Sequence, residues 1–299
     1  MSLFACAAHA IEERAVEVNG LHGTLILPEG EARVPAALIL AGSGPVDRDG
    51  NMPGMRNDSL RLLAEELAEQ GIATLRTDKR GVAESAPAVP REEDLRFGTY
   101  VDDAASWLSW LSEQTRVDRV FLIGHSEGAL VATLAERSMP VSGVMLLAGA
   151  GQPAGMIIER QLAAAGVPAA LQAASQRIAR ALEAGEKVTD VPEPLLPLYG
   201  ASVQDYLISW FRLDPAQSLS EVSAPVMIVQ GTTDLQVSMD DFMRLKGARP
   251  GARTLVVEGM NHVLKNAPGD RNANLATYLD PALPLAPALV PALAAFIAP

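Results

Sequence analysis

The pentapeptide GHSEG at residues 124–128 follows an apolar run at 120–123 and precedes an Ala- and Leu-rich segment. A G-x-S-x-G pattern between a strand and a helix is typical of a tight turn that holds a nucleophilic serine clear of the sheet. The two glycines allow neighbouring backbone to approach because they have no Cβ. The helix that follows offers free N–H groups to a developing oxyanion. Ser126 is therefore the candidate nucleophile.

A carboxylate and an imidazole follow two later strand-like runs. Asp234 comes after the run 226–230, and His262 comes after the run 254–257. Ligands bind beyond the carboxyl ends of the strands in a doubly wound sheet, so we expect these side chains to meet Ser126 at one edge. His262 would then take the serine proton as general base, and Asp234 would orient the imidazole and stabilise its charged form.

Each of these roles has few rivals in the chain. Of the four histidines, His9 lies in the N-terminal stretch and His22 lies in an expected hairpin. His125 precedes the serine, where the sharp turn is expected to direct it below the sheet. His262 is thus the candidate base. For the acid, the aspartates at 240–241 are rivals of Asp234, but they read as the first residues of the next helix.

An oxyanion hole needs two backbone N–H donors. One is expected from Glu127, the residue after the nucleophile, and the other from Ser43 in the glycine-rich turn 42–45. The side chain of Glu127 is expected to pair with a nearby arginine. Charged residues on the adjoining loops are expected to brace the oxyanion turn through ion pairs and hydrogen bonds: Asp47, Arg48, Asp49, Asp78 and Arg80.

The elements that position these residues alternate along the chain. A hairpin at 14–27 precedes strands at 36–40, 72–76, 120–123 and 143–147, with helices between them at 59–70, 98–113 and 127–138. This order predicts a mostly parallel, doubly wound α/β sheet covered on both faces. Four helices without a strand follow between 154 and 213, and they predict a helical insertion. We therefore expect a core of residues 14–150 and 223–299, an inserted helical cap at 151–222, and a disordered or signal-derived segment at 1–13.

Composition restricts the classes of partner. Of the 299 residues, 48% are hydrophobic and 20% are charged, as in soluble globular proteins. The net charge of −12 repels phosphate backbones and anionic lipids, so we expect no nucleic-acid partner. Four prolines interrupt the apolar C-terminal stretch 281–299, which argues against stable membrane insertion. No metal or nucleotide motif is present, so we expect neither a metal nor a cofactor.

The N-terminal stretch leaves two expectations for the cellular compartment. Cys6 is the only cysteine, so no intrachain disulfide can form. Residues 3–10 are small and apolar, and 8–10 fit an A-x-A cleavage pattern, but there is no basic start and the apolar run is short. We expect a cytoplasmic protein, with a periplasmic or secreted one as the alternative if residues 3–10 are a trimmed signal peptide.

The chain resembles bacterial serine esterases of the α/β-hydrolase superfamily with a helical cap. The resemblance rests on the segment AGSGPVDRDG at 41–50, on RTDKRG at 76–81 and on GHSEG at 124–128, and it extends over nearly the whole chain. One departure is Ala41, where many relatives carry a non-catalytic histidine. The resemblance implies hydrolysis of a small-molecule carboxylic ester through an acyl-enzyme intermediate without a cofactor.

Two other activities remain open at this point. The same residues could cleave a thioester or an amide, as in a thioesterase or a small aminopeptidase. An aminopeptidase should present a carboxylate from the cap to the free amino terminus, and the candidates are Glu159, Glu183, Glu186 and Glu193. Some proteins of this fold are non-catalytic receptors for small molecules, but a complete set of serine, histidine and aspartate argues against that function.

Overall fold

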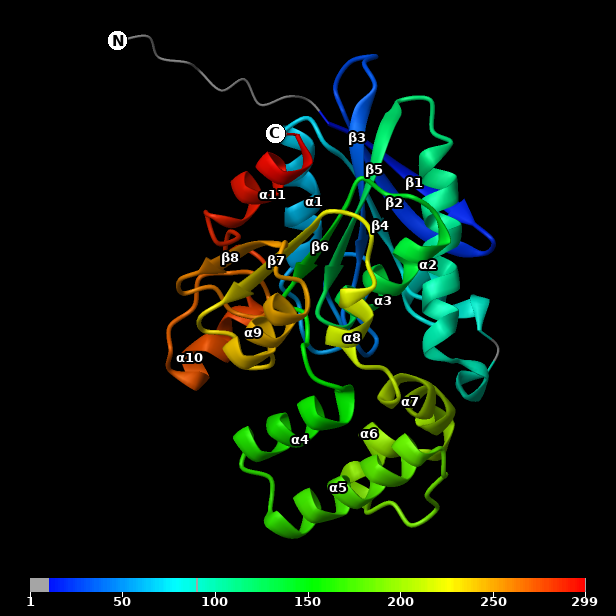
Figure 1. Cartoon of the computed structure of the whole chain (residues 1–299), viewed down its shortest axis with the longest axis vertical. Coiled ribbons are helices and arrows are strands. Elements are labelled where there is room, and N and C mark those ends of the chain that lie inside the picture. Colours follow the sequence, from blue (N-terminus) through cyan, green and yellow to red (C-terminus); the bar gives the residue numbers. More distant parts are fainter. Residues whose placement is uncertain (1–10, 90, 299) are drawn as a thin grey trace.

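An eight-stranded sheet runs through the computed structural model, which describes residues 11–89 and 91–298. The strands lie in the order β1-β2-β4-β3-β5-β6-β7-β8 (Figure 1). They are β1 (Ile11–Val18), β2 (Leu21–Pro28), β3 (Val34–Leu40), β4 (Ala73–Thr77), β5 (Val117–His125), β6 (Gly143–Leu147), β7 (Val226–Gly231) and β8 (Arg253–Val257). The pairs β1–β2 and β2–β4 are antiparallel, and the remaining pairs are parallel. The predicted α/β class is confirmed.

Helices cover both faces of this sheet because successive side chains of a strand point to opposite faces. In β3, Leu38 belongs to the same buried cluster as Trp107 of α2, whereas Ile39 belongs to a second cluster with Leu63 of α1 and Leu293 of α11. The helices around the sheet are α1 (Ser59–Glu69), α2 (Phe97–Ser112), α3 (Glu127–Ala135), α9 (Met239–Ala248), α10 (Arg271–Ala276) and α11 (Leu289–Ile297).

Five further helices lie between β6 and β7. They are α4 (Ala154–Ala164), α5 (Ala169–Ala184), α6 (Leu196–Tyr199), α7 (Gln204–Phe211) and α8 (Pro215–Ser220). Figure 1 shows α4–α7 beyond one end of the sheet, and their residues, such as Ile178 and Phe211, form a cluster of their own. Leu219 of α8 belongs instead to a cluster of the sheet. Phe97 of α2 stacks on Trp210 of α7, with ring centres 5.9 Å apart, and so joins the two groups of helices.

The sequence predicts boundaries for a core, a cap and an N-terminal segment. β1 begins at Ile11, which is earlier than the expected start of the folded chain at residue 14. The expectations for residues 1–10 lie outside the described residues. The division into a core and a cap at 151–222 stays a prediction. Among the helices that the structure describes, none has both the length and the apolar character needed to cross a bilayer.

Candidate active site

Ser126 lies in a sharp turn between β5 and α3. Its backbone angles, φ 55° and ψ −119°, fall in a region that costs a non-glycine residue about 1–3 kcal/mol. The turn is held by a hydrogen bond from the Ser126 amide to the carbonyl of Leu147, at 2.9 Å. A Cβ on Gly124 would overlap the backbone of Gly128, and a Cβ on Gly128 would overlap the carbonyl of Leu40. Both glycines of the motif are therefore required by close packing of the backbone.

His262 and Asp234 form a buried pair on the loops after β8 and β7. Nδ1 of His262 lies 2.9 Å from Oδ2 of Asp234, and the two side chains are 6% and 0% exposed. The other carboxylate oxygen accepts hydrogen bonds from the amides of Gln236 and Val237 at 2.7 and 3.0 Å.

The environment of this pair keeps the Asp234 carboxylate ionised. Burial alone would raise the pKa of Asp234, but the His262 imidazole and the two backbone N–H groups outweigh it and lower that pKa below its usual value. An ionised Asp234 accepts a hydrogen bond, so the network assigns the proton of neutral His262 to Nδ1. Nε2 is then free to act as a base.

Ser126 and His262 line one pocket of about 100 Å³, together with His125 and Ser43. Within residues 11–89 and 91–298 the Ser126 hydroxyl makes no hydrogen bond. Catalytic hydrogen bonds are often long in a free enzyme and tighten when substrate binds. The structure thus brings the predicted serine and histidine to a common pocket and bonds the histidine to the predicted acid.

The backbone around Ser43 passes directly against Ser126, the candidate nucleophile. A Cβ on Gly42 would lie 3.1 Å from Cβ of Ser126 and 3.5 Å from its Oγ, so only glycine gives the loop this path with ease. Across the described part of the chain, the amides of Ser43 and Glu127 donate no hydrogen bond to another protein group. Two free N–H groups beside a serine can receive a negatively charged oxygen.

The chain matches known proteins over most of its length. A family model described as serine aminopeptidase, S33, matches residues 54–193. Esterase EstD of Thermotoga maritima is 28% identical over 264 residues, which are 87% of this chain; the chain spans 62% of that protein's length.

Solved structures share the architecture. Est1E from Butyrivibrio proteoclasticus aligns with a TM-score of 0.55 at 16% identity, over 89% of this chain and 94% of its own. The proline iminopeptidase of Mycobacterium smegmatis aligns with a TM-score of 0.55 at 14% identity, over 84% and 92%. The fold is that of the α/β-hydrolases. The predicted fold is thereby confirmed, and Ser126 lies in the turn between β5 and α3 of this fold.

His125, in contrast to the expectation from sequence, lines the pocket of Ser126 and His262 rather than lying below the sheet. Its Nε2 is 2.7 Å from the carbonyl oxygen of His262, and the two ring centres are 4.8 Å apart. Burial, the largest cause, lowers the pKa of His125 to about 3, so the ring is neutral near pH 7. No pattern in the sequence indicates this contact, because it depends on the path of the loop that carries His262.

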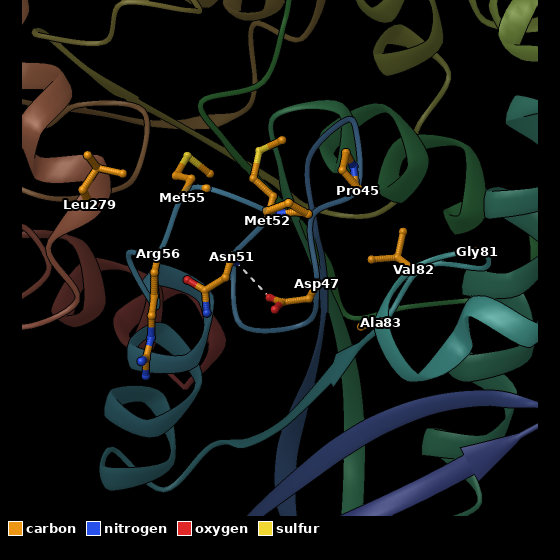
Figure 2. A pocket seen from close by; sticks show the side chains of 12 residues that line it. Pro45, Asp47, Asn51, Met52, Met55, Arg56, Gly81, Val82, Ala83 and Leu279 are labelled. Carbon is orange, nitrogen blue, oxygen red and sulfur yellow. Dashed lines mark hydrogen bonds between the residues drawn. The ribbon is translucent and has the colours of Figure 1, made fainter. Parts of the chain in front are cut away.

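A second cavity of about 700 Å³ adjoins the serine pocket (Figure 2). Met52 and Met55 line both cavities. Reciprocal backbone hydrogen bonds of 3.0 and 2.9 Å join these two residues around the turn formed by Pro53 and Gly54. Leu279, which is 62% exposed, also lines the outer cavity. The two methionines therefore stand between a small inner pocket and a larger outer one.

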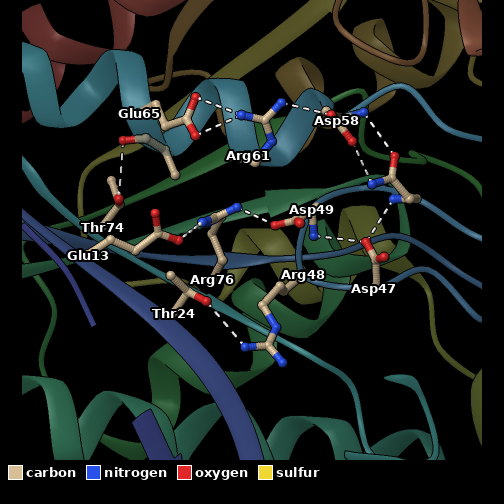
Figure 3. Close-up of polar contacts among 12 residues, drawn as sticks. Glu13, Thr24, Asp47, Arg48, Asp49, Asp58, Arg61, Glu65, Thr74 and Arg76 are labelled. Carbon is tan, nitrogen blue, oxygen red and sulfur yellow. Dashed lines mark hydrogen bonds and ion pairs between the residues drawn. The ribbon is translucent and has the colours of Figure 1, made fainter. Parts of the chain in front are cut away.

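The loop between β3 and α1 is braced by a buried polar network (Figure 3). Asp47 accepts hydrogen bonds from the amides of Asp49 and Asn51, both at 2.9 Å. Asp49 pairs with Arg76, whose side chain is 2% exposed. Asn51 donates to Asp58 at 2.7 Å. The predicted bracing by Asp47 and Asp49 is observed, whereas the contributions of Asn51 and Asp58 went unrecognised in the sequence.

The two arginines predicted to brace these loops, Arg48 and Arg80, form ion pairs with different aspartates. Arg48 pairs with Asp78 at 2.6 Å, as the bracing hypothesis requires. Arg80 instead pairs with Asp103 of α2 at 2.6 Å, and it also donates a hydrogen bond to the carbonyl of Ala88 at 2.8 Å. The expected arginine partner of Glu127 is also wrong: the nearest cation to its carboxylate is Lys79, at 4.0 Å.

Histidine, cysteine and acidic side chains could in principle hold a metal near the site. Among the residues that the structure describes, no group of three or more of them is arranged to do so.

Proposed function

We propose that this protein is a serine hydrolase that cleaves small carboxylic esters through an acyl-enzyme intermediate. The observation that carries the proposal is the hydrogen-bonded pair of His262 and Asp234, which shares an edge of the sheet with the strained turn at Ser126. The match to a curated esterase supports the choice of an ester as substrate.

The proposed reaction has two steps, acylation of Ser126 and hydrolysis of the acyl-enzyme, and His262 acts as the base in both. Ser126 Oγ attacks the ester carbonyl while His262 Nε2 takes the hydroxyl proton, and Asp234 stabilises the imidazolium. The amides of Ser43 and Glu127 bind the oxyanion of the tetrahedral intermediate. The imidazolium returns the proton to the departing alcohol. Water, deprotonated by His262, then attacks the acyl-enzyme, and the carboxylic acid leaves as Ser126 regains its proton.

Helices α4–α7 are proposed to act as a cap that limits access to this site. In support, Val203 and Tyr206 of this group line a cavity of about 340 Å³ together with Gly44 and Glu127 of the core. A cap in that position shields the serine from water and restricts the shape of the substrate.

The test compares wild type with Ser126→Ala on p-nitrophenyl acetate and follows covalent labelling by a fluorophosphonate. We expect the variant to lose at least about 10³-fold in kcat and all labelling. Ser223→Ala, a serine distant from the site, serves as the control and should match wild type. Equal hydrolysis and labelling by wild type and Ser126→Ala would disprove the proposal.

An aminopeptidase activity is the second candidate, because the matching family model is described as serine aminopeptidase. It would use the same serine, with a glutamate of α4–α7 binding the substrate amino group. Aminoacyl p-nitroanilides compared with p-nitrophenyl esters at equal concentration discriminate the two. A kcat/KM for the anilides above that for the esters would favour the peptidase.

A further inference from the structure

Lys79 lies on the loop after β4 and reaches under the oxyanion turn. Its side chain is 11% exposed. The ammonium donates hydrogen bonds to the carbonyl of Gly44, at 2.6 Å, and to the carbonyl of Gly42. One cation therefore holds the carbonyl groups on both sides of Ser43, whose amide is the candidate oxyanion donor.

The Gly42 carbonyl and the Ser43 amide belong to the same peptide unit. A trans peptide is planar, and its C=O and N–H point in opposite directions. Fixing the oxygen with Lys79 thus fixes the direction in which the Ser43 N–H points. A cation on the oxygen also polarises the amide and makes its N–H a stronger donor. Both effects act on the proposed oxyanion site without any contact between Lys79 and substrate.

The carboxylate of Glu127 lies beside this buried ammonium group. Its carboxylate is 4.0 Å from Lys79 Nζ, and the side chain is 2% exposed. Neither carboxylate oxygen has a hydrogen-bond partner among the described residues. The ring of Tyr100 lies 5.6 Å from the ammonium and adds a cation–π contact. Because the Glu127 amide is the other candidate oxyanion donor, the pair of Lys79 and Glu127 connects the two segments that carry the donors.

We propose that Lys79 is a positioning residue of the oxyanion hole, which orients and polarises the Gly42–Ser43 peptide toward the reacting oxygen. This inference rests on the proposed serine-hydrolase function. A buried ion pair that served only the fold would stabilise the protein but would not act selectively on the transition state.

The first test replaces Lys79 by Met and by Arg and measures kcat and KM on p-nitrophenyl acetate. We expect Lys79→Met to lower kcat on the order of 10²-fold with KM within threefold, since an oxyanion donor acts in the transition state. Lys79→Arg, which keeps a cation, should recover at least tenfold of that loss. Arg137→Met, which removes an exposed cation paired with Glu221 at 2.7 Å, is the control and should retain the wild-type kcat.

Inhibitor binding separates positioning from a general effect on the fold. Phenylboronic acid forms a tetrahedral adduct with a catalytic serine and resembles the intermediate, so its affinity should fall in Lys79→Met in proportion to kcat/KM. N-Methylacetamide, a neutral ligand whose carbonyl resembles the ground-state ester, should bind equally well to both. If Lys79→Met does not fold, Lys79→Gln, which keeps one neutral donor, takes its place.

The pH dependence of kcat provides a readout that a structural role would not move. Burial lowers the pKa of Lys79 below 10.5, so wild-type kcat should fall on the alkaline side as the ammonium deprotonates. Arginine stays charged, so Lys79→Arg should lose this alkaline fall. The titratable and charged groups that line the same cavities as Lys79 are Asp78, Arg80, Glu92, Tyr100, Asp103, Glu127 and Tyr206.

The possible outcomes separate this inference from the proposed function. Wild type without ester hydrolysis and without labelling at Ser126 would overturn both. An active wild type whose folded Lys79→Met variant keeps kcat and boronate affinity within threefold would overturn the inference alone. A Lys79→Met variant that loses only thermal stability would also overturn it. So would a Lys79→Arg variant that recovers no kcat and shows the same alkaline fall in kcat as wild type.

Discussion

The imidazole of His125 is hydrogen-bonded to the backbone of His262, with Nε2 2.7 Å from the carbonyl oxygen. A carbonyl only accepts, so the network assigns the proton of His125 to Nε2. The residue before the candidate nucleophile thereby holds the loop of the candidate base. This contact ties β5, which ends at His125, to the loop after β8, although β6 and β7 lie between these two strands in the sheet.

Removal of this hydrogen bond should loosen the loop of His262. We expect His125→Phe to lower the free energy of unfolding at pH 7 by about 1–3 kcal/mol, because a buried carbonyl loses its donor. His125→Gln, which can present an amide N–H in the same direction, should lose less. Urea unfolding measures both. Equal stability of His125→Phe and wild type would show that the contact contributes nothing.

The same substitution should change how stability depends on pH. The pKa of folded His125 is lowered to about 3, whereas the unfolded pKa is near 6.5. Between these values the unfolded state binds the extra proton, so this contribution is complete above about pH 6.5 and is lost as the pH falls toward 3. The loss is about 1.4 kcal/mol for each pH unit in that window. His125→Phe should show a correspondingly flatter acid limb.

The role of the Asp234 charge can be tested with asparagine, which has the same size and shape as aspartate. Asp234→Asn keeps the size of the side chain, but its amide and carbonyl no longer select the Nδ1–H form of His262. We expect kcat on p-nitrophenyl acetate to fall by about 10²–10⁴-fold. Asp240→Asn, on the exposed side of α9, is the matched control and should keep full activity. A fall of less than threefold in kcat for Asp234→Asn would show that Asp234 does not orient His262 for catalysis.

Most of the sheet and of the candidate site follow from local patterns. Buried β-branched runs, helical spacing and the turn at Ser126 are encoded within short windows, and parallel strands necessarily bring Ser126, Asp234 and His262 to one edge. The contacts of His125 and Lys79 could not be predicted in this way. They depend on where two loops from distant strands pass each other, and no periodicity in the sequence reports that path.

The polar network of the loop between β3 and α1 also contains a contact that the sequence does not predict. Asp47 and Asp49 stand beside the glycine turn in the sequence, so their bracing role could be inferred. Asp58 stands at the start of α1 and reads as a helix cap, yet its side chain makes no cap hydrogen bond and turns instead to Asn51 and Arg61. Its positive φ of 54° redirects the side chain, and that angle is set by the tertiary path of the loop.

Asp58 should therefore contribute to stability in a pH-dependent manner. Burial alone would raise its pKa, but hydrogen bonds from Arg61 and Asn51 outweigh it and lower the pKa to about 2. Against an unfolded pKa near 3.8, this stabilises the fold by about 2 kcal/mol above pH 4. The contribution is lost as the pH falls toward 2.

The variant Asp58→Asn keeps the hydrogen-bonding shape and tolerates the positive φ. It should be less stable than wild type by about 2 kcal/mol at pH 7 and by about half of that at pH 3. Urea unfolding at both pH values provides the measurement. A difference that is the same at pH 7 and pH 3 would mean that the charge of Asp58 is not what stabilises the loop.

Met52 and Met55 should determine how long a substrate the proposed esterase accepts. The inner pocket of about 100 Å³ holds only a small group beside Ser126, whereas the outer cavity of about 700 Å³ has room for an extended chain. A chain that leaves the inner pocket must pass the two methionines, which are flexible enough to move aside. Substitution by a larger, stiffer ring should close this passage, and truncation should widen it.

We therefore expect Met55→Trp to lower kcat/KM for p-nitrophenyl octanoate at least tenfold more than for the acetate, and Met55→Ala to shift the ratio in the opposite direction. Each buried methylene of the acyl chain contributes about 0.8 kcal/mol, so loss of contact for two or three of them accounts for a tenfold effect. Met243→Ala, an exposed methionine of α9, controls for loss of a thioether elsewhere. Parallel changes for both esters would indicate that the outer cavity does not receive the acyl chain. Acetate esters of alcohols of increasing length would then show whether the leaving group occupies the outer cavity. In that case Met55→Trp should lower kcat/KM more for the longer alcohols.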